Sequence, residues 1–81
     1  MLKLNKLIGK DLTYIMNENN ISDYYIHSKL KICSSSTLKY IKSGNRKSKI
    51  IPLDIIINIY KALGQTEINI KDGNNTLIIR F

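Results

Sequence analysis

The stretch that decides the fold is ISDYYIHSKLKICSSSTLKYIKSG, residues 21–44, which contains two short helical patterns joined by a turn. Ser22 is a good N-cap for the first helix, and Asp23 in the first turn complements the positive end of the helix dipole. This helix runs to about Leu30, with Ile26 and Leu30 facing inward. It is too short to be stable without packing against the rest of the chain.

The second helix of this stretch begins among the serines. Serine and threonine hydroxyls satisfy the free amides at a helix start, so the run CSSST at residues 33–37 places that start at Cys33 or Ser34. The body of the helix covers about residues 35–43. Its inward residues are Leu38 and Ile41, and Gly44 stands where a C-terminal cap glycine belongs.

Helices are expected on both sides of this stretch. Apolar residues at spacings of three and four predict a helix over about residues 4–18, ended by Asn19-Asn20. Pro52 suits the first position of a further helix, where its missing amide would be unpaired anyway. Gly64 ends that helix, and its inner face is formed by Ile55, Ile56, Ile59 and Leu63.

The hydrophobic period changes to two after Gly64. Ile68 and Ile70 alternate with polar residues, and the turn residues DGNN follow at 72–75. In the last segment Leu77, Ile79 and Phe81 alternate with Ile78 and Arg80. This pattern predicts a β-hairpin, which must pack on the helices or pair with another chain because an isolated hairpin is marginal in water.

These elements fit one small domain. The chain has 81 residues and is 43% hydrophobic, which is enough to build a core. We therefore expect a mainly α fold of four to five helices with a C-terminal β-hairpin. Residues 1–64 would form the helical domain, and residues 65–81 the hairpin.

The net charge of +7 lies in the middle of the chain. Residues 24–53 hold seven lysines and arginines and no acidic residue, whereas the rest of the chain holds six of each sign. A single acid-free basic segment is a candidate surface for a polyanion, and the serines interleaved with its lysines favour nucleic acid. The alternative is a solvated charged face with no partner.

The composition argues against several other classes of protein. Cys33 is the only cysteine and His27 the only histidine, which rules out an intrachain disulfide and is too few ligands for a metal. The longest apolar run is far short of a membrane span, and residues 1–9 lack the apolar core of a signal peptide. We expect a cytoplasmic protein that is not an enzyme and that needs no cofactor.

Two short helices with a tight turn, the second opening with small polar residues, form a helix-turn-helix arrangement. The amino end of such a second helix can enter the major groove of DNA, where hydroxyls and amides bind base edges. Lysines outside the groove neutralise phosphates and make the affinity depend on salt. The serines can also serve as caps, and we expect at least one of them to be a cap only.

Three segments of the chain carry motifs, and the order of these motifs along the chain is informative. Residues 8–22, IGKDLTYIMNENNIS, contain Ile-Gly-x-x-Leu and end in a hydrophobic residue followed by serine. Residues 37–47, TLKYIKSGNRK, contain an apolar pair and a closing glycine, and residues 51–64, IPLDIIINIYKALG, open at proline and end in Ala-Leu-Gly. Together they resemble the first, recognition and fourth helices of the Cro/repressor-type helix-turn-helix family, also called the XRE family.

The chain departs from that family at several positions. The family usually has alanine at the place of His27, where two helices nearly touch, so His27 should tilt outward or widen the crossing. It usually has glycine in the turn where Lys31 stands, and the turn here is one residue longer, which leaves the register along the serines open by one. Met16 and Lys42 replace a family arginine–glutamate pair, so Lys42 should add to the positive face.

The resemblance also implies contacts with DNA. The positions that would contact bases are Ser34, Ser35, Ser36 and Lys39. Contacts with phosphates would come from Ser22, Tyr24, Lys42, Asn45, Arg46 and Lys47.

The outer strand of the hairpin suggests a dimer. It is short and apolar with an unpaired edge, and pairing with its twin through Leu77, Ile78, Ile79 and Phe81 would protect that edge. Similar Cro-type proteins dimerise through β-strands. A two-fold homodimer would place two recognition helices roughly 34 Å apart and predicts a palindromic operator. The alternative is a hairpin that folds back on its own helices.

The first functional interpretation is a sequence-specific DNA-binding repressor of the type found in phages, plasmids and other mobile elements, which blocks polymerase by occupying an operator. The alternative is a protein-binding helix-turn-helix module, such as an antitoxin or a phage-encoded inhibitor of a host nuclease system. Stable co-purification with a host protein, without a shift of any promoter DNA, would favour the second.

Overall fold

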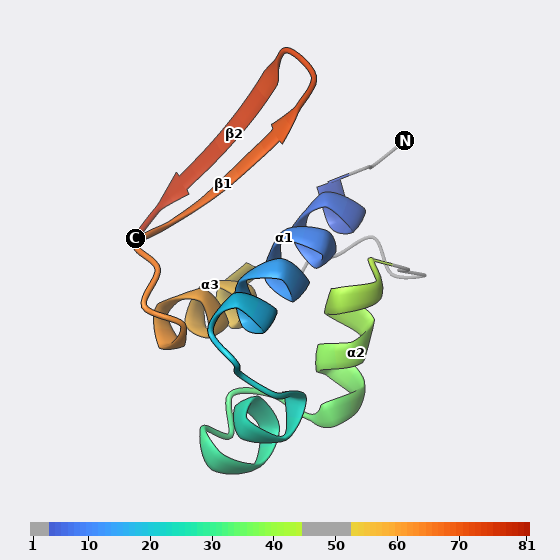
Figure 1. Cartoon of the computed structure of the whole chain (residues 1–81), viewed down its shortest axis with the longest axis vertical. Coiled ribbons are helices and arrows are strands. Elements are labelled where there is room, and N and C mark those ends of the chain that lie inside the picture. Colours follow the sequence, from blue (N-terminus) through green and yellow to red (C-terminus); the bar gives the residue numbers. More distant parts are fainter. Residues whose placement is uncertain (1–3, 45–52) are drawn as a thin grey trace.

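A computed structural model describes residues 4–44 and 53–81 of the chain. Within these ranges the protein is mainly helical and ends in an antiparallel hairpin, as the sequence predicts (Figure 1). Helix α1 lies in the middle, with α2 and α3 packed on it and the hairpin alongside its amino-terminal half. The elements, in chain order, are α1 Leu4–Glu18, the π-helix η1 Tyr25–Lys29, α2 Ser35–Ser43, α3 Leu53–Ala62, β1 Glu67–Asp72 and β2 Asn75–Arg80.

Helix α1 has the bounds that its apolar spacing predicts. Its buried side chains Ile8, Leu12 and Met16 lie four residues apart on one face. The helix ends before Asn20, whose φ of 55° is the left-handed conformation that asparagine tolerates. Local patterning is therefore sufficient to define this helix.

The segment after α1 begins as predicted but winds differently. The amide of Tyr25 donates to the Ser22 hydroxyl at 3.2 Å, which confirms Ser22 as the cap. The helix then widens, and the amide of Leu30 donates to the Tyr25 carbonyl at 2.9 Å, five residues back. A π-helix closes its hydrogen bonds over one residue more than an α-helix, so each of its turns is wider.

This wide winding corrects one prediction. Leu30 was expected to face the core with Ile26, but only Ile26 is buried, and Leu30 is 37% exposed. The residue four positions after Ile26 would share its face in an α-helix, whereas in a π-helix it is rotated away. Ile32 packs against the core in its place.

Helix α2 follows the sequence closely. It begins after Ser34, one of the two expected starts, and its buried residues are Leu38 and Ile41. It ends at Gly44, whose φ of 67° is the left-handed conformation of a C-terminal cap. Pro52, predicted as the first residue of the next helix, lies outside the described residues.

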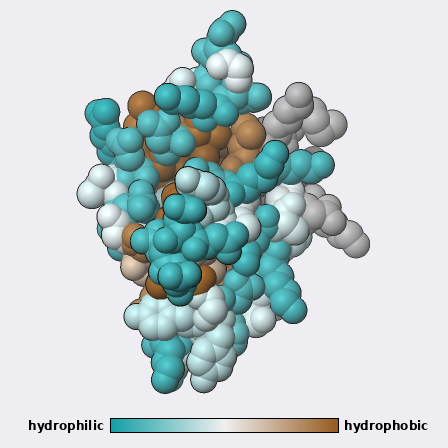
Figure 2. Space-filling view, viewed as in Figure 1, coloured by the Kyte–Doolittle hydropathy of each residue, from teal (hydrophilic) through white to brown (hydrophobic). Residues whose placement is uncertain are grey.

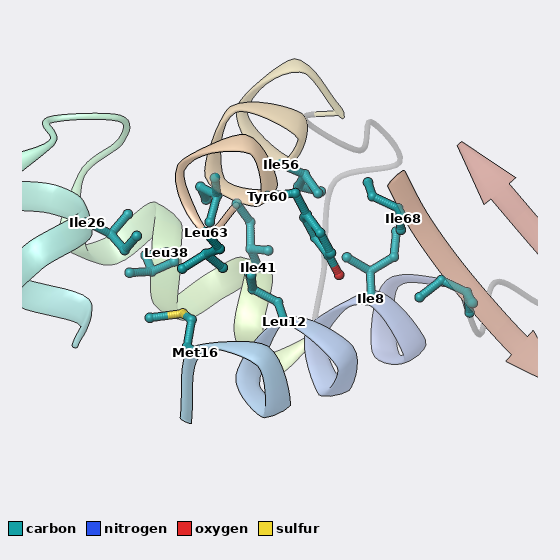
Figure 3. Close-up of a cluster of buried hydrophobic side chains, with 12 residues drawn as sticks. Ile8, Leu12, Met16, Ile26, Leu38, Ile41, Ile56, Tyr60, Leu63 and Ile68 are labelled. Atoms are coloured by element: carbon teal, nitrogen blue, oxygen red, sulfur yellow. The ribbon is translucent and has the colours of Figure 1, made fainter. Parts of the chain in front are cut away.

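Helix α3 buries one residue that periodicity did not single out. Ile56, Ile59 and Leu63 are buried as expected and Ile55 is half-buried, but Tyr60 is also fully buried. The side chain of Tyr60 points from α3 toward α1 (Figure 3). Its hydroxyl donates to Asp11 Oδ2 at 2.7 Å. The buried tyrosine thus keeps a partner for its one polar atom.

The hairpin packs on the helices through its first strand. Ile68 and Ile70 of β1 are buried, and β1 contacts both α1 and α3. Gly73 in the two-residue turn has a φ of 62°, which a hairpin turn beginning with glycine requires. Strand β2 is outermost in Figure 1, and its residues are exposed except Ile79, which is half-buried.

A single apolar cluster joins these elements. It contains buried side chains from α1, η1, α2, α3, Leu63 and β1, and Figure 3 shows most of them converging between the helices. The described residues bury no charged side chain. The polar and basic residues of the central segment are therefore left for the surface.

Candidate nucleic-acid interface

Helix α2 is held in place by an unusually close crossing with α1. A Cβ atom at Gly9 would collide with the backbone carbonyls of Ile41 and Lys42, and one at Gly44 would lie 2.6 Å from the Cα atom of Lys6. Only glycine permits this approach of the two backbones. Because the inner face of α2 is fixed by Leu38 and Ile41, its opposite face is presented to solvent.

The first of the three serines is a cap. The Ser34 hydroxyl accepts from the amide of Thr37 at 3.2 Å and lies 2.9 Å from Thr37 Oγ1 and 3.3 Å from Ser36 Oγ. Ser34 is therefore engaged in starting the helix, as we expected for at least one serine. Ser36 is exposed and Ser35 is half-buried at the open amino end of α2.

The exposed face of α2 forms a shallow open hollow of about 560 Å3, lined by Ser36, Thr37, Lys39, Tyr40 and Ser43. Ser36 and Lys39 were predicted to contact bases and lie together here. Tyr40 and Ser43 were not predicted as site residues. They follow Ser36 by four and seven residues, which places all three on the same face of the helix. This spacing could have identified Tyr40 and Ser43 from the sequence.

Lys42 does not add to the positive face as predicted. Its ammonium group lies 2.6 Å from Asp23 Oδ1, and the two side chains are 26% and 35% exposed. Asp23 lies just before the acid-free segment, whereas Lys42 lies within it. A count of charges along the sequence therefore does not show that the fold pairs these two side chains. The charge of Lys42 is compensated inside the protein, which weighs against its predicted contact with a phosphate.

Only some of the other residues predicted to contact phosphates lie in the described ranges. Ser22 and Tyr24 are exposed at the start of the second helical segment. The Tyr24 ring packs edge-on against His27, with 5.7 Å between the ring centroids. His27 is half-buried, and its Nδ1 lies 2.8 Å from Ser28 Oγ. Asn45, Arg46 and Lys47 lie outside the described residues.

The turn between the two helical segments adds exposed cations. Lys29 and Lys31 are exposed, as is Lys39 on α2. Lys31 has a φ of 54°, the left-handed conformation that lysine rarely adopts and that glycine adopts at no steric cost. The residue at which the resemblance implies glycine therefore has a glycine-like backbone.

No family model, curated protein or solved structure matches this chain.

Two titratable groups in the described ranges have raised pKa values. Burial raises the pKa of the Cys33 thiol, which favours its protonated form. Burial, with the nearby Asp11 carboxylate, raises the pKa of Tyr60 well above its usual value. No three metal-binding side chains gather in residues 4–44 and 53–81, and none of the helices there is long and apolar enough to cross a membrane.

The predicted dimerisation residues divide into two groups. Leu77 and Ile78 are 37% and 44% exposed, whereas Ile79 and Phe81 are half-buried and pack against the core. Lys61 Nζ lies 5.9 Å from the centre of the Phe81 ring, so Phe81 is engaged by its own chain. Figure 2 shows apolar surface in the upper part of the molecule, where the hairpin lies.

Proposed function

We propose that this protein is a sequence-specific DNA-binding repressor. Helix α2 would enter the major groove with Ser36, Lys39 and Tyr40 toward the base edges, and the protein would act by occupying an operator. Hydroxyls and an ammonium group are suitable donors for the acceptor atoms of guanine and adenine in that groove. The resemblance to the Cro/repressor-type family points the same way.

The observation that carries the proposal is the division of α2 into two faces. Leu38 and Ile41 are buried, and Gly9 brings α1 against the backbone behind them. The opposite face is open and holds small hydroxyl side chains, one tyrosine and a cation. A helix that is rigidly supported from behind and has only short side chains near its amino end can approach DNA closely.

The charges support the same partner. Lys29, Lys31 and Lys39 are exposed, and neither of the two ion pairs found in residues 4–44 and 53–81 involves them. Their charges are thus available to phosphates. Ser22 and Tyr24 at the start of the preceding segment are exposed hydrogen-bonding groups that suit phosphate oxygens.

In-vitro selection from random duplex DNA tests the proposal. We expect an enriched motif, and we expect the affinity for it to fall steeply as salt rises, because phosphate contacts release counterions. Lys39→Ala should weaken binding and change base preference. Lys10→Ala is the matched control, since Lys10 is an exposed lysine on α1, and it should change the affinity little.

Two results would contradict the proposal: selection that enriches no motif, or an affinity that is the same at low and physiological salt. Capture of a host protein together with no enriched DNA would support the protein-binding module instead.

A further inference from the structure

The second helical segment exposes apolar side chains that neither the core nor the proposed DNA contacts use. They belong to a surface, here called the η1 surface, whose residues are all exposed: Tyr24, Tyr25, Lys29, Leu30 and Lys31. In Figure 1 this segment lies at the lower end of the molecule, close to the start of α2 and far from the hairpin. The η1 surface is therefore a neighbour of the proposed DNA-binding helix.

The apolar part of the η1 surface is built on Tyr25 and Leu30. They are 42% and 37% exposed, and the amide of Leu30 donates to the Tyr25 carbonyl at 2.9 Å, so the two residues lie one π turn apart. Tyr24 is 60% exposed, and its ring packs on His27 with 5.7 Å between the centroids. Tyrosine is enriched at protein interfaces, and covering these side chains with apolar groups of a partner is favourable.

The charged part of the η1 surface is positive only. Lys29 and Lys31 are exposed, and residues 24–53 contain no acidic residue. Neither lysine belongs to an ion pair within the part of the chain that the structure describes. Asp23 just before the surface is already compensated, because its Oδ1 lies 2.6 Å from Lys42 Nζ. Apolar side chains bordered by such cations are complementary to a partner that combines apolar residues with carboxylates.

Nucleic acid matches only the cations of this surface. Phosphate oxygens bind cations and hydrogen-bond donors, and the Leu30 side chain is neither. Single strands stack their bases on aromatic rings. Tyr24 and Tyr25 are consecutive residues of a helical segment, so their side chains point in different directions and form no common platform for stacking.

A membrane surface is also a poor match. A helix that lies on a bilayer buries a continuous apolar face among the headgroups. The π-helix is only five residues long, and its buried residue Ile26 faces the core of the protein. The segment therefore has no long apolar face to offer to lipid.

We propose that the η1 surface binds an acidic, apolar segment of a partner protein. Apolar side chains of that segment cover Tyr25 and Leu30, and its carboxylates pair with Lys29 and Lys31. The same two lysines are available to phosphates in the proposed function, so the partner and DNA compete for them. The partner is thus an antagonist of operator binding. The competition rests on the proposed function, whereas the binding of the segment does not.

Selection of a random peptide library displayed on phage, against the immobilised full chain, tests the binding. We expect enriched peptides that combine Asp or Glu with aromatic or aliphatic residues. Synthetic copies should bind Leu30→Ser about tenfold more weakly than the native protein, the size of effect typical of a central interface residue. Leu53→Ser is the matched control, because Leu53 is 38% exposed at the start of α3, and it should bind like the native protein.

A second variant keeps the test independent of any one substitution. Tyr25→Ser acts on the same surface and should weaken peptide binding as Leu30→Ser does. Circular dichroism of both variants should stay native, because both side chains are partly exposed.

Competition with DNA separates this proposal from the proposed function. An excess of the acidic peptide should release the native protein from the selected duplex. Leu30→Ser should keep the native affinity for DNA but resist this release, whereas Lys29→Gln combined with Lys31→Asn should weaken binding to both ligands. If no duplex is enriched, the proposed function and the competition fail together, and peptides that depend on Leu30 still support the binding.

Several outcomes would overturn the proposal. Selection could enrich no peptides or only peptides without acidic residues, or the peptides could bind both serine variants as tightly as the native protein. Sedimentation of the native protein, but not of Leu30→Ser, with phosphatidylserine vesicles would identify a membrane as the occupant instead. A peptide that binds through Leu30 and leaves the DNA complex intact would overturn the competition.

Discussion

The ammonium group of Lys42, near the end of α2, lies 2.6 Å from the carboxylate of Asp23, at the start of the second helical segment. These residues are 19 positions apart. Ile26 is the buried residue of η1, and the pair of Lys42 with Asp23 adds a polar link between the second segment and α2. The pair thus helps to set the angle between the two helical segments of the proposed DNA-binding unit.

Loss of this ion pair should destabilise the fold modestly without removing a phosphate contact. For Lys42→Met we expect about 0.5–1 kcal/mol of lost stability, because both side chains are partly solvated. The charge-swapped double variant Asp23→Lys with Lys42→Asp should recover most of it. Urea denaturation of Asp23→Lys, of Lys42→Asp and of the double variant measures the coupling energy between the two side chains. If the losses of stability in the two single variants simply add in the double variant, the pair contributes nothing.

The same substitution tests whether Lys42 contacts DNA. The slope of the logarithm of affinity against the logarithm of salt falls by about 0.9 for each phosphate contact removed. Since Lys42 is paired inside the protein, Lys42→Met should leave that slope unchanged. A drop in slope of the size expected for one phosphate would mean that Lys42 leaves Asp23 when DNA binds.

A methyl group at Gly9 should force α1 and α2 apart. Its Cβ would collide with two backbone carbonyls that cannot move without displacing α2. We expect Gly9→Ala to cost about 1–3 kcal/mol, in the range of overpacked cores. For a domain of this size each kcal/mol lowers the melting temperature by about 4–8 °C, which calorimetry detects easily. Lys10→Ala, at the exposed neighbouring position, should melt like the native protein.

The Tyr60 hydroxyl should make stability depend on alkaline pH. Its pKa is raised in the folded protein by burial and by Asp11. The folded state therefore holds its proton more tightly than the unfolded chain, whose tyrosines titrate near about pH 10. The resulting stabilisation is complete below about pH 10 and declines as the pH rises above that value.

The phenylalanine variant isolates this effect. Tyr60→Phe removes a hydrogen bond to a carboxylate and should cost about 1.5–3 kcal/mol at neutral pH. The difference in stability between the native protein and the variant should then shrink above about pH 10. Denaturant titrations at neutral pH and at several alkaline pH values measure it, and a difference that stays constant into strong alkali would show that the proton on Tyr60 is not responsible.

Local features of the fold could be predicted from the sequence because their causes lie within a few residues. The apolar spacing in residues 4–18, the cap at Ser34, the glycine at position 44 and the alternation around Ile68 each need only their neighbours to act. The exposed face of α2 follows in the same way once Leu38 and Ile41 are assigned to the core. Tyr40 was missed there because tyrosine at helical spacing also suits packing.

The features that sequence reasoning missed depend on contacts between distant segments. Asp11 and Tyr60 are 49 residues apart, and no local pattern shows that a tyrosine of α3 will reach a carboxylate of α1. The partner of Lys42 was missed for the same reason. The outward position of Leu30 depends on the π winding of η1, and a pattern with α-helical spacing cannot anticipate that winding.

Substitutions of the serines at the start of α2 should distinguish a helix cap from a contact with DNA. Ser34 accepts from the amide of Thr37, so Ser34→Ala should cost about 1 kcal/mol of stability. Ser36 is exposed in the hollow of α2 and is not the cap residue. Ser36→Ala should therefore leave the melting temperature nearly unchanged and weaken binding to the selected duplex.

Paired measurements of melting and binding distinguish the two roles. Ser34→Gly is a useful third variant, because glycine at a cap costs only a few tenths of a kcal/mol relative to serine. If its affinity for DNA matches that of the native protein, the Ser34 hydroxyl acts within the protein alone. If Ser36→Ala binds as well as the native protein while Ser34→Gly does not, base contacts begin at the cap itself, and α2 enters the groove by its tip instead of its exposed face.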